Sequence, residues 1–490
     1  MRRIPATLIV LAAAWSAVSC ASRAEPRGPW TLKTADAPAP TPAALGAPRS
    51  DTVARALPYI TAPRAMRDVE DLVAFGTRHT ESETSSPTRG IGAARTWVAE
   101  QFRAAATDTR PMDVELVGHT QHPVEGRITR PVEILNVVAT LPGSLPPELR
   151  QEIWVLAHLD SRITERSDSV NDSPGANDDA SGVAVLLALA RALGEIPLDH
   201  TVILAATSGE EQGLFGAAEL ARRARARSAP IRAILNNDTV GDPIGHHAPG
   251  SVAAREAARA IRVFSVGIPA DATPEEVARI SALGAESDSL ARQVARFMVE
   301  IAAIYNLPVR PALVYRNDRF LRGGDHTAFI REDYDAAVRL TVPYEDYTRQ
   351  HEDIRTVIDE STGRAIPYGD TADHIDPEYL AAVARLNLAT VIHLASAPTA
   401  PADVRILTAT LDTSTTLRWS PSPDPDVAGY EVVTRQTSDP MWTRVFPVPG
   451  GPDATETTLP LSKDNLLFGI RAFDAEGYRS LVTFAGAARE

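Results

Sequence analysis

The chain has 490 residues, a length that predicts two or three domains at roughly 100–200 residues per domain. Hydrophobic residues make up 44% and charged residues 23%, which excludes collagen-like, coiled-coil and wholly disordered proteins. The net charge of −14 (49 Lys and Arg against 63 Asp and Glu) argues against nucleic-acid binding, which needs a basic surface. The single cysteine, Cys20, excludes an intrachain disulfide and a metal cage made of thiolates.

Residues 1–20 predict an export signal. A basic start precedes the mostly apolar segment 4–18, which is shorter than the roughly 20 residues that a membrane span needs. Cys20 follows in a segment that resembles a bacterial lipoprotein cleavage box, although Ala17 stands where a branched aliphatic residue is usual. The alternative is ordinary cleavage after Ala21 or Ala24. We expect a periplasmic, cell-surface or extracellular protein that contacts the membrane only through a lipid on Cys20.

A linker rich in Pro and Ala is predicted at 21–58, followed by a globular domain at 59–396. Short apolar runs alternate with helical patterns along this domain, which predicts an α/β fold with an open, mixed, mostly parallel sheet and helices on both faces. The region 251–305 is rich in Ala and Arg and is expected to be helical. The expected strands are 134–141, 153–157, 201–206, 231–235, 312–315 and 338–342, and the main expected helices are 92–106, 181–193 and 377–395.

Residues 397–490 have a different character. Short strands at 416–419, 430–434 and 466–473 are separated by turns rich in Pro, Gly and Asp, a spacing typical of a small all-β sandwich. Trp419 and the segment LLFGIRAFDAEGYRS at 466–480 resemble a fibronectin type III module.

Side chains that bind metals follow several of the expected strands. His158 and Asp160 come after 153–157, the pair Glu210 and Glu211 after 201–206, and Asp238 after 231–235. Sites in open α/β sheets lie outside the carboxyl ends of the strands, so these residues can converge there.

Each of these features also has a structural interpretation when taken alone. Asp178, in the turn before the helix 181–193, is a good helix cap. The pair Glu210 and Glu211 suits a helix N-terminus, where acidic residues favour the dipole. Together, imidazole and several carboxylates suit zinc, and a shared carboxylate can join two ions. A His two residues before an Asp lets that carboxylate orient the imidazole.

Four segments resemble the secreted zinc aminopeptidases of peptidase family M28. They are AHLDS at 157–161, PGANDDASG at 174–182, SGEEQGLFGA at 208–217 and NNDTVG at 236–241. The resemblance extends over residues 60–396 and implies the zinc exopeptidase fold and two zinc ions per chain. It implies that His158 and Asp238 bind one zinc, that Glu211 binds the other, and that Asp178 bridges both.

The resemblance also implies that Glu210 is the general base for a metal-bound water and that Asp160 orients His158. His351, in YTRQHEDIRT, is the expected last ligand of the second zinc. His326, in GGDHTAFI, resembles a segment that lies near the substrate in the family, although Gly324 replaces its usual Ser.

The expected function is therefore that of an exported zinc aminopeptidase that hydrolyses the N-terminal bond of peptides or proteins with a free N-terminus. Two alternatives stay open. The first is a glutaminyl cyclase-like acyltransferase, which has the same fold and binds one zinc. The second is a surface-binding protein whose peptidase domain is inactive.

Overall fold

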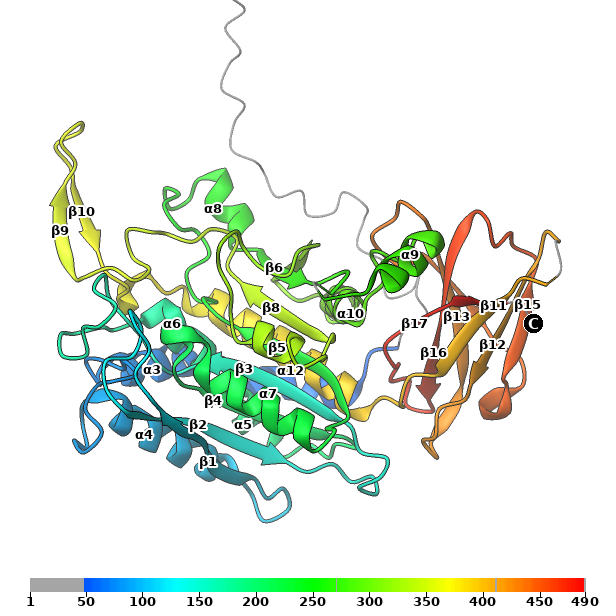
Figure 1. The fold of residues 1–490 in the computed structure, drawn as a ribbon, viewed down its shortest axis with the longest axis horizontal. Coiled ribbons are helices and arrows are strands. Elements are labelled where there is room, and N and C mark those ends of the chain that lie inside the picture. The colour runs from blue at the N-terminus through cyan, green and yellow to red at the C-terminus, as the bar shows by residue number, and fades with distance from the viewer. Residues whose placement is uncertain (1–47, 270, 410–411, 489–490) are drawn as a thin grey trace, which may run out of the picture. The chain divides into compact units, whose positions relative to one another are not determined.

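A computed structural model describes residues 48–269, 271–409 and 412–488 (Figure 1). The predicted export signal, Cys20 and the first part of the predicted linker lie outside the described residues. The end of that linker differs from the prediction, because Asp51–Ala56 forms helix α2 and Leu57–Tyr59 a short 3-10 turn. Val53 and Ala56 are buried in the main hydrophobic core, so this segment is part of the folded domain.

The central sheet has eight strands in the order β1-β2-β4-β3-β5-β8-β6-β7. Strands β4, β3, β5 and β8 lie side by side and run parallel, whereas β1 and β2 form an antiparallel edge. The predicted mixed α/β fold is confirmed. The strands are β1 (Asp113–Gln121), β2 (Val132–Leu141), β3 (Glu152–His158), β4 (Thr201–Thr207), β5 (Ile231–Asn237), β6 (Ala260–Ser265), β7 (Arg310–Val314) and β8 (Ala337–Thr341).

Both faces of this sheet are covered, as alternate residues of β3 show. Val155 and Ala157 belong to the main core, and Trp154 and Leu156 belong to a second, smaller core. The helices of the main core are α3 (Ala62–Val73), α4 (Gly90–Ala105), α5 (Ser181–Leu193), α10 (Leu290–Ile304) and α12 (Pro377–Ser396), and those of the second are α7 (Phe215–Ala226) and α11 (His326–Ile330) (Figure 1). Helix α12 is long and apolar enough to cross a membrane, but 94% of its apolar window is buried, as in a core helix.

The expectation of an entirely helical region at 251–305 is wrong. This region contains α8 (Val252–Ala257), α9 (Pro274–Leu283) and α10, but strand β6 lies between the first two. Strand β6 is parallel to β7 and antiparallel to β8, and Ile261 and Val263 are fully buried. The Ala- and Arg-rich sequence on both sides of this short apolar strand led to a helical prediction for the whole region. Sequence analysis also missed β1 and the hairpin of β9 (Arg355–Ile358) and β10 (Ala365–Tyr368).

The C-terminal region is all-β, as predicted, and contains two four-stranded sheets. Trp419, Tyr430 and Phe468 belong to its hydrophobic core. The likeness to fibronectin type III stays a prediction. One sheet contains β11 (Ala402–Leu407), β12 (Thr415–Ser420), β15 (Glu456–Leu459) and β18 (Gly486–Ala488), and the other β13 (Val427–Gln436), β14 (Arg444–Pro447), β16 (Leu466–Asp474) and β17 (Thr483–Phe484).

Buried ion pairs join helix α10 to this all-β region. Glu300 on α10 pairs with Arg471 on β16 at 3.1 Å, and Arg471 also pairs with Glu431 on β13 at 2.8 Å. Asp288, which precedes α10, pairs with Arg435 on β13. All of these side chains are buried, so each charge depends on its partner across the contact.

We predict that Arg471→Met destabilises the folded chain, because it leaves Glu300 buried without its partner. Removal of one member of a buried pair costs about 3–5 kcal/mol. Thermal unfolding measures the loss, and the second change Glu300→Gln is expected to recover part of it. Arg444→Gln, an exposed change on neighbouring β14, is the control. Equal melting temperatures for Arg471→Met and this control would contradict the prediction.

Candidate active site

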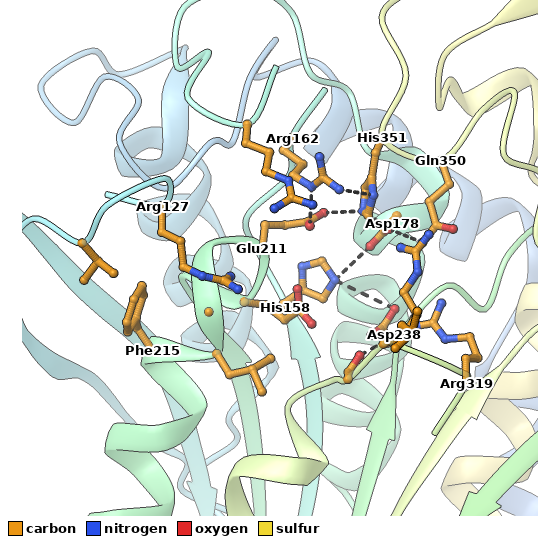
Figure 2. Close-up of a pocket in the computed structure, with 18 of the residues that line it drawn as sticks. Arg127, His158, Arg162, Asp178, Glu211, Phe215, Asp238, Arg319, Gln350 and His351 are labelled. Carbon is orange, nitrogen blue, oxygen red and sulfur yellow. Dashed lines mark hydrogen bonds and ion pairs between the residues drawn. The ribbon is translucent and has the colours of Figure 1, made fainter. Parts of the chain in front are cut away.

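The candidate site residues lie at one edge of the central sheet. His158 ends β3, Asp238 follows β5, and His351 lies in the loop after β8. Glu210 and Glu211 begin the short helix α6 (Glu210–Gly213) after β4. Because β4, β3, β5 and β8 are parallel neighbours, their carboxyl ends place these side chains together (Figure 2).

Asp178 lies at the centre of this cluster, in an irregular turn at Ala176–Ala180 before α5. One of its oxygens, Oδ1, is 2.9 Å from Nε2 of His158, and the other, Oδ2, is 2.9 Å from Nε2 of His351. Asp238 Oδ1 is 4.0 Å from the same nitrogen of His158, and Glu211 Oε1 is 3.0 Å from that of His351. Two groups of three possible ligands therefore share Asp178, and the ligand atoms of each group lie within 4.8 Å of one another.

The turn that carries Asp178 is held by groups that sequence analysis missed. The main-chain N–H groups of Asn177 and Asp178 donate to the carboxylate of Asp370, at 2.8 and 2.7 Å. Gln350 Nε2 donates to Asp178 Oδ2 at 2.7 Å. Burial raises the pKa of Asp370 to about 7. Asp370 lies nearly 200 residues from the turn, so no local pattern pointed to it.

Asp179, next to Asp178, ties three segments together. Its carboxylate accepts hydrogen bonds from the main-chain N–H groups of His158 at 3.1 Å, Gly182 at 3.0 Å and Thr239 at 3.1 Å. The end of β3, the start of α5 and the end of β5 are thereby fixed to one another. Gly182 is required here, since a Cβ on it would lie 2.4 Å from the carbonyl oxygen of Asn237.

Positive charge compensates the carboxylates of the cluster. Arg339, which is fully buried, pairs with Asp238 at 2.9 Å, and Arg162 pairs with Glu211 at 2.9 Å. Burial alone lowers the pKa of His351, but the charge of Glu211 and the hydrogen bond to Asp178 outweigh it and raise that pKa to about 9. The protonated imidazoles therefore place positive charge between the carboxylates. A metal cation at the same positions would also compensate the negative charge of these carboxylates.

Glu210 differs from Glu211 in its surroundings. Within the described ranges, no hydrogen bond or ion pair involves the Glu210 carboxylate, which faces the cavity beside His158. Burial raises the pKa of Glu210 well above its usual value. Glu211 instead faces both His351 and Arg162. The two adjacent acids therefore have separate environments, one free and one engaged with the cluster.

Asp160 contacts His158 through a different atom from the expected one. His158 Nδ1 is 2.9 Å from the main-chain carbonyl oxygen of Asp160 and 3.9 Å from its carboxylate. The carboxylate instead accepts hydrogen bonds from the main-chain N–H groups of Glu210 at 3.2 Å and Glu211 at 3.1 Å. Asp160 thus fixes the start of α6 as well as the imidazole of His158.

His326, expected near the substrate, is fully buried and does not line the cavity. Its Nε2 is 3.0 Å from the main-chain carbonyl oxygen of Asn317, a contact that holds the loop before α11. Burial lowers the pKa of His326 to about 4. The structure therefore places His351 in the cluster and leaves His326 in the protein interior.

A cavity of about 610 Å³ opens next to the cluster. His158, Asp178, Glu210 and Glu211 line it together with apolar side chains that include Phe215 (Figure 2). The arrangement provides a cluster of possible metal ligands, a free carboxylate and space for a small substrate in one place.

Comparison with known proteins assigns this chain to a family. The model of Peptidase family M28 matches residues 136–391, just over half of the chain. A probable zinc metalloprotease of Leptosphaeria maculans is 42% identical over 413 residues, which cover 84% of this chain and 91% of that protein. A probable zinc metalloprotease of Pyricularia oryzae is 40% identical over 434 residues, 87% of this chain and 83% of that protein. The chain therefore belongs to peptidase family M28 and is a metallopeptidase.

Proposed function

We propose that this enzyme is an exported zinc aminopeptidase with two zinc ions per chain. The observation that carries the proposal is the position of Asp178, whose two oxygens each lie 2.9 Å from a different imidazole. A carboxylate placed in this way suits a bridge between two cations. The experiment that tests the proposal compares peptides with a free N-terminus and acetylated peptides. Release of the first amino acid from the free peptides alone is expected, and equal cleavage of both would contradict it.

The residues of the cluster fit zinc in their chemistry. His158, Asp178 and Asp238 would hold one ion, and Asp178, Glu211 and His351 the other, each a set of imidazole and carboxylate donors that zinc prefers. The buried oxygen Glu211 Oε1 lies 3.0 Å from Nε2 of His351, a spacing that suits two atoms that bind the same ion. When bound, zinc lowers the pKa of water toward about 7 and stabilises negative charge on the substrate carbonyl oxygen.

Glu210 is the proposed general base. Its carboxylate faces the cavity and has no hydrogen bond or ion pair among the described residues, so it is available to take a proton from the attacking water and to give it to the leaving amine. Asp160 supports this role, because it fixes the main-chain N–H of Glu210 at the start of α6.

The acids that line the cavity support N-terminal specificity. Asp178, Glu210, Glu211 and Asp238 all line the cavity. A free ammonium group is attracted to such a group of carboxylates, whereas an acetylated N-terminus carries no charge and gains nothing there.

We predict that zinc content distinguishes the two candidate histidines. His351→Ala is expected to lose about one zinc per chain, because its imidazole belongs to one of the two ligand groups. His326→Ala should keep both ions and lower the melting temperature, since His326 is buried away from the cavity. Elemental analysis and thermal unfolding of both variants measure this. A loss of zinc from His326→Ala but not from His351→Ala would show that the ligand assignment is wrong.

The adjacent glutamates allow a second prediction, in which the same substitution at the two positions has different effects. Glu210→Gln is expected to keep both metals and lose at least about 100-fold in kcat, within the usual range for acid–base catalysis. Glu211→Gln should instead weaken zinc binding, because Glu211 faces His351. Turnover and zinc content are measured on the same preparations. Near-normal turnover by Glu210→Gln would refute its role as the base.

Export is proposed from residues 1–20, with Cys20 as the lipid attachment site. When the full chain is expressed in a bacterium that processes lipoproteins, labelled fatty acid should enter the wild-type protein and not Cys20→Ser. An exported wild-type protein without label would favour ordinary signal cleavage.

A further inference from the structure

The walls of the cavity are unusually rich in arginine for a chain with a net charge of −14. Figure 2 shows two of these side chains, Arg127 and Arg319, on opposite sides of His158. The arginines that line the cavity are Arg127, Arg162, Arg166, Arg319, Arg322 and Arg331.

Two of the six arginines form ion pairs with acidic side chains of the protein. Arg162 pairs with Glu211 at 2.9 Å, and Arg319 pairs with Asp318 at 3.2 Å and with Glu345 at 2.8 Å. Their side chains are only 12% and 11% exposed, so both are part of the folded structure of the site.

The other four arginines are exposed and form no ion pair with a carboxylate in the described part of the chain. Arg127 donates to the main-chain carbonyl oxygen of Gln212 at 3.1 Å, and the guanidinium of Arg322 lies 5.5 Å from the centre of the Tyr347 ring. Neither contact neutralises the charge of its guanidinium, so these groups are available to an anion in the cavity.

These four arginines come from three regions of the chain, because Arg322 and Arg331 lie on either side of the short helix α11. Arg127 lies between β1 and β2, Arg166 follows β3, Arg322 follows β7, and Arg331 follows the last residue of α11. The fold therefore brings unpaired positive charge from distant parts of the chain to one cavity. Arginine is well suited to bind carboxylates, because its planar guanidinium can donate two hydrogen bonds to one group.

Acidic side chains and unpaired arginines line the same cavity. Asp178, Glu211 and Asp238 belong to the proposed metal cluster, where zinc ions and the substrate ammonium would balance them, whereas the four exposed arginines form no ion pair with these acids in the described part of the chain. A substrate that matches both has an ammonium at the cleaved end and a carboxylate a short distance away.

We propose that this enzyme prefers short peptides that carry a carboxylate close to the cleaved bond, and that Arg127, Arg166, Arg322 and Arg331 bind it. This inference rests on the proposed function. The carboxylate has two possible sources, which are an acidic side chain on the first or second residue and the free C-terminus of a dipeptide.

Matched substrates separate these sources. Leu-Glu-amide against Leu-Gln-amide tests the second side chain, Glu-Leu-amide against Gln-Leu-amide tests the first, and Leu-Leu against Leu-Leu-amide tests the C-terminus. In at least one pair, kcat/KM is expected to favour the carboxylate by about 10-fold or more, as hydrogen bonds between charged groups allow. The preference should shrink as ionic strength rises, because salt screens charges on the exposed walls. No preference in any pair would overturn the inference.

Variants then test the arginines themselves. Each of the four is replaced by Gln, singly and together. The ratio of kcat/KM for the carboxylate substrate to kcat/KM for its uncharged match is expected to fall, and to fall furthest in the fourfold variant. These arginines are exposed and leave no buried acid without a partner, so the variants should fold, as their melting temperatures will show. Arg103→Gln, on the exposed face of α4 and outside the cavity, is the control and should leave the ratio unchanged. An unchanged ratio in the fourfold variant would show that other groups select the carboxylate.

A binding measurement keeps the test independent of turnover. In Glu210→Gln, calorimetry compares the Kd values within each of the three pairs, and tighter binding of the carboxylate member is expected in at least one of them. Equal Kd values in all three pairs would overturn the inference. Hydrolysis of Leu-Leu-amide without any carboxylate preference would also overturn it while leaving the aminopeptidase proposal intact. Equal cleavage of acetylated and free peptides would refute the aminopeptidase proposal. The kcat/KM ratios within the three substrate pairs could still be measured in that case, so the two failures are distinguishable.

Discussion

Several carboxylates held close together at one sheet edge repel one another unless positive charge lies between them, and this constraint organises the site. Asp178 is the central member, because each of its oxygens faces a different imidazole. Arg339 beside Asp238 and Arg162 beside Glu211 compensate the outer members of the cluster. The same need for positive charge makes the cluster a suitable place for metal cations.

The fold holds this arrangement with main-chain hydrogen bonds as well as side-chain contacts. Four neighbouring parallel strands end at one edge, and Asp179 fixes two of those ends to the start of α5. Asp370 fixes the turn that carries Asp178 from a segment far along the chain. Rigid support of this kind orients metal ligands and keeps like charges at short distances. The carboxylate of Glu210 faces the cavity and forms no hydrogen bond or ion pair in the part of the chain that the structure describes.

The parts of the fold that follow from periodic apolar patterns could be predicted from the sequence. Helix α5 has the expected bounds, and the residues after β3, β4 and β5 converge as parallel strands require. Strand β6 was missed, because a short apolar run between Ala- and Arg-rich segments has no helical or alternating signature of its own. The contact of Asp370 with the Asp178 turn and the arginines that line the cavity were also missed. Both depend on long-range packing, and no local sequence motif indicates them. His326 illustrates the converse, since it lies in a family-like segment but its side chain is buried and does not line the cavity.

The central claim is that Asp178 joins two zinc ions. A crystal structure of the zinc-loaded enzyme, with anomalous data collected on both sides of the zinc absorption edge, tests it most directly. The account predicts two anomalous peaks, one among His158, Asp178 and Asp238 and the other among Asp178, Glu211 and His351. A single peak, or peaks that Asp178 does not contact, would contradict it.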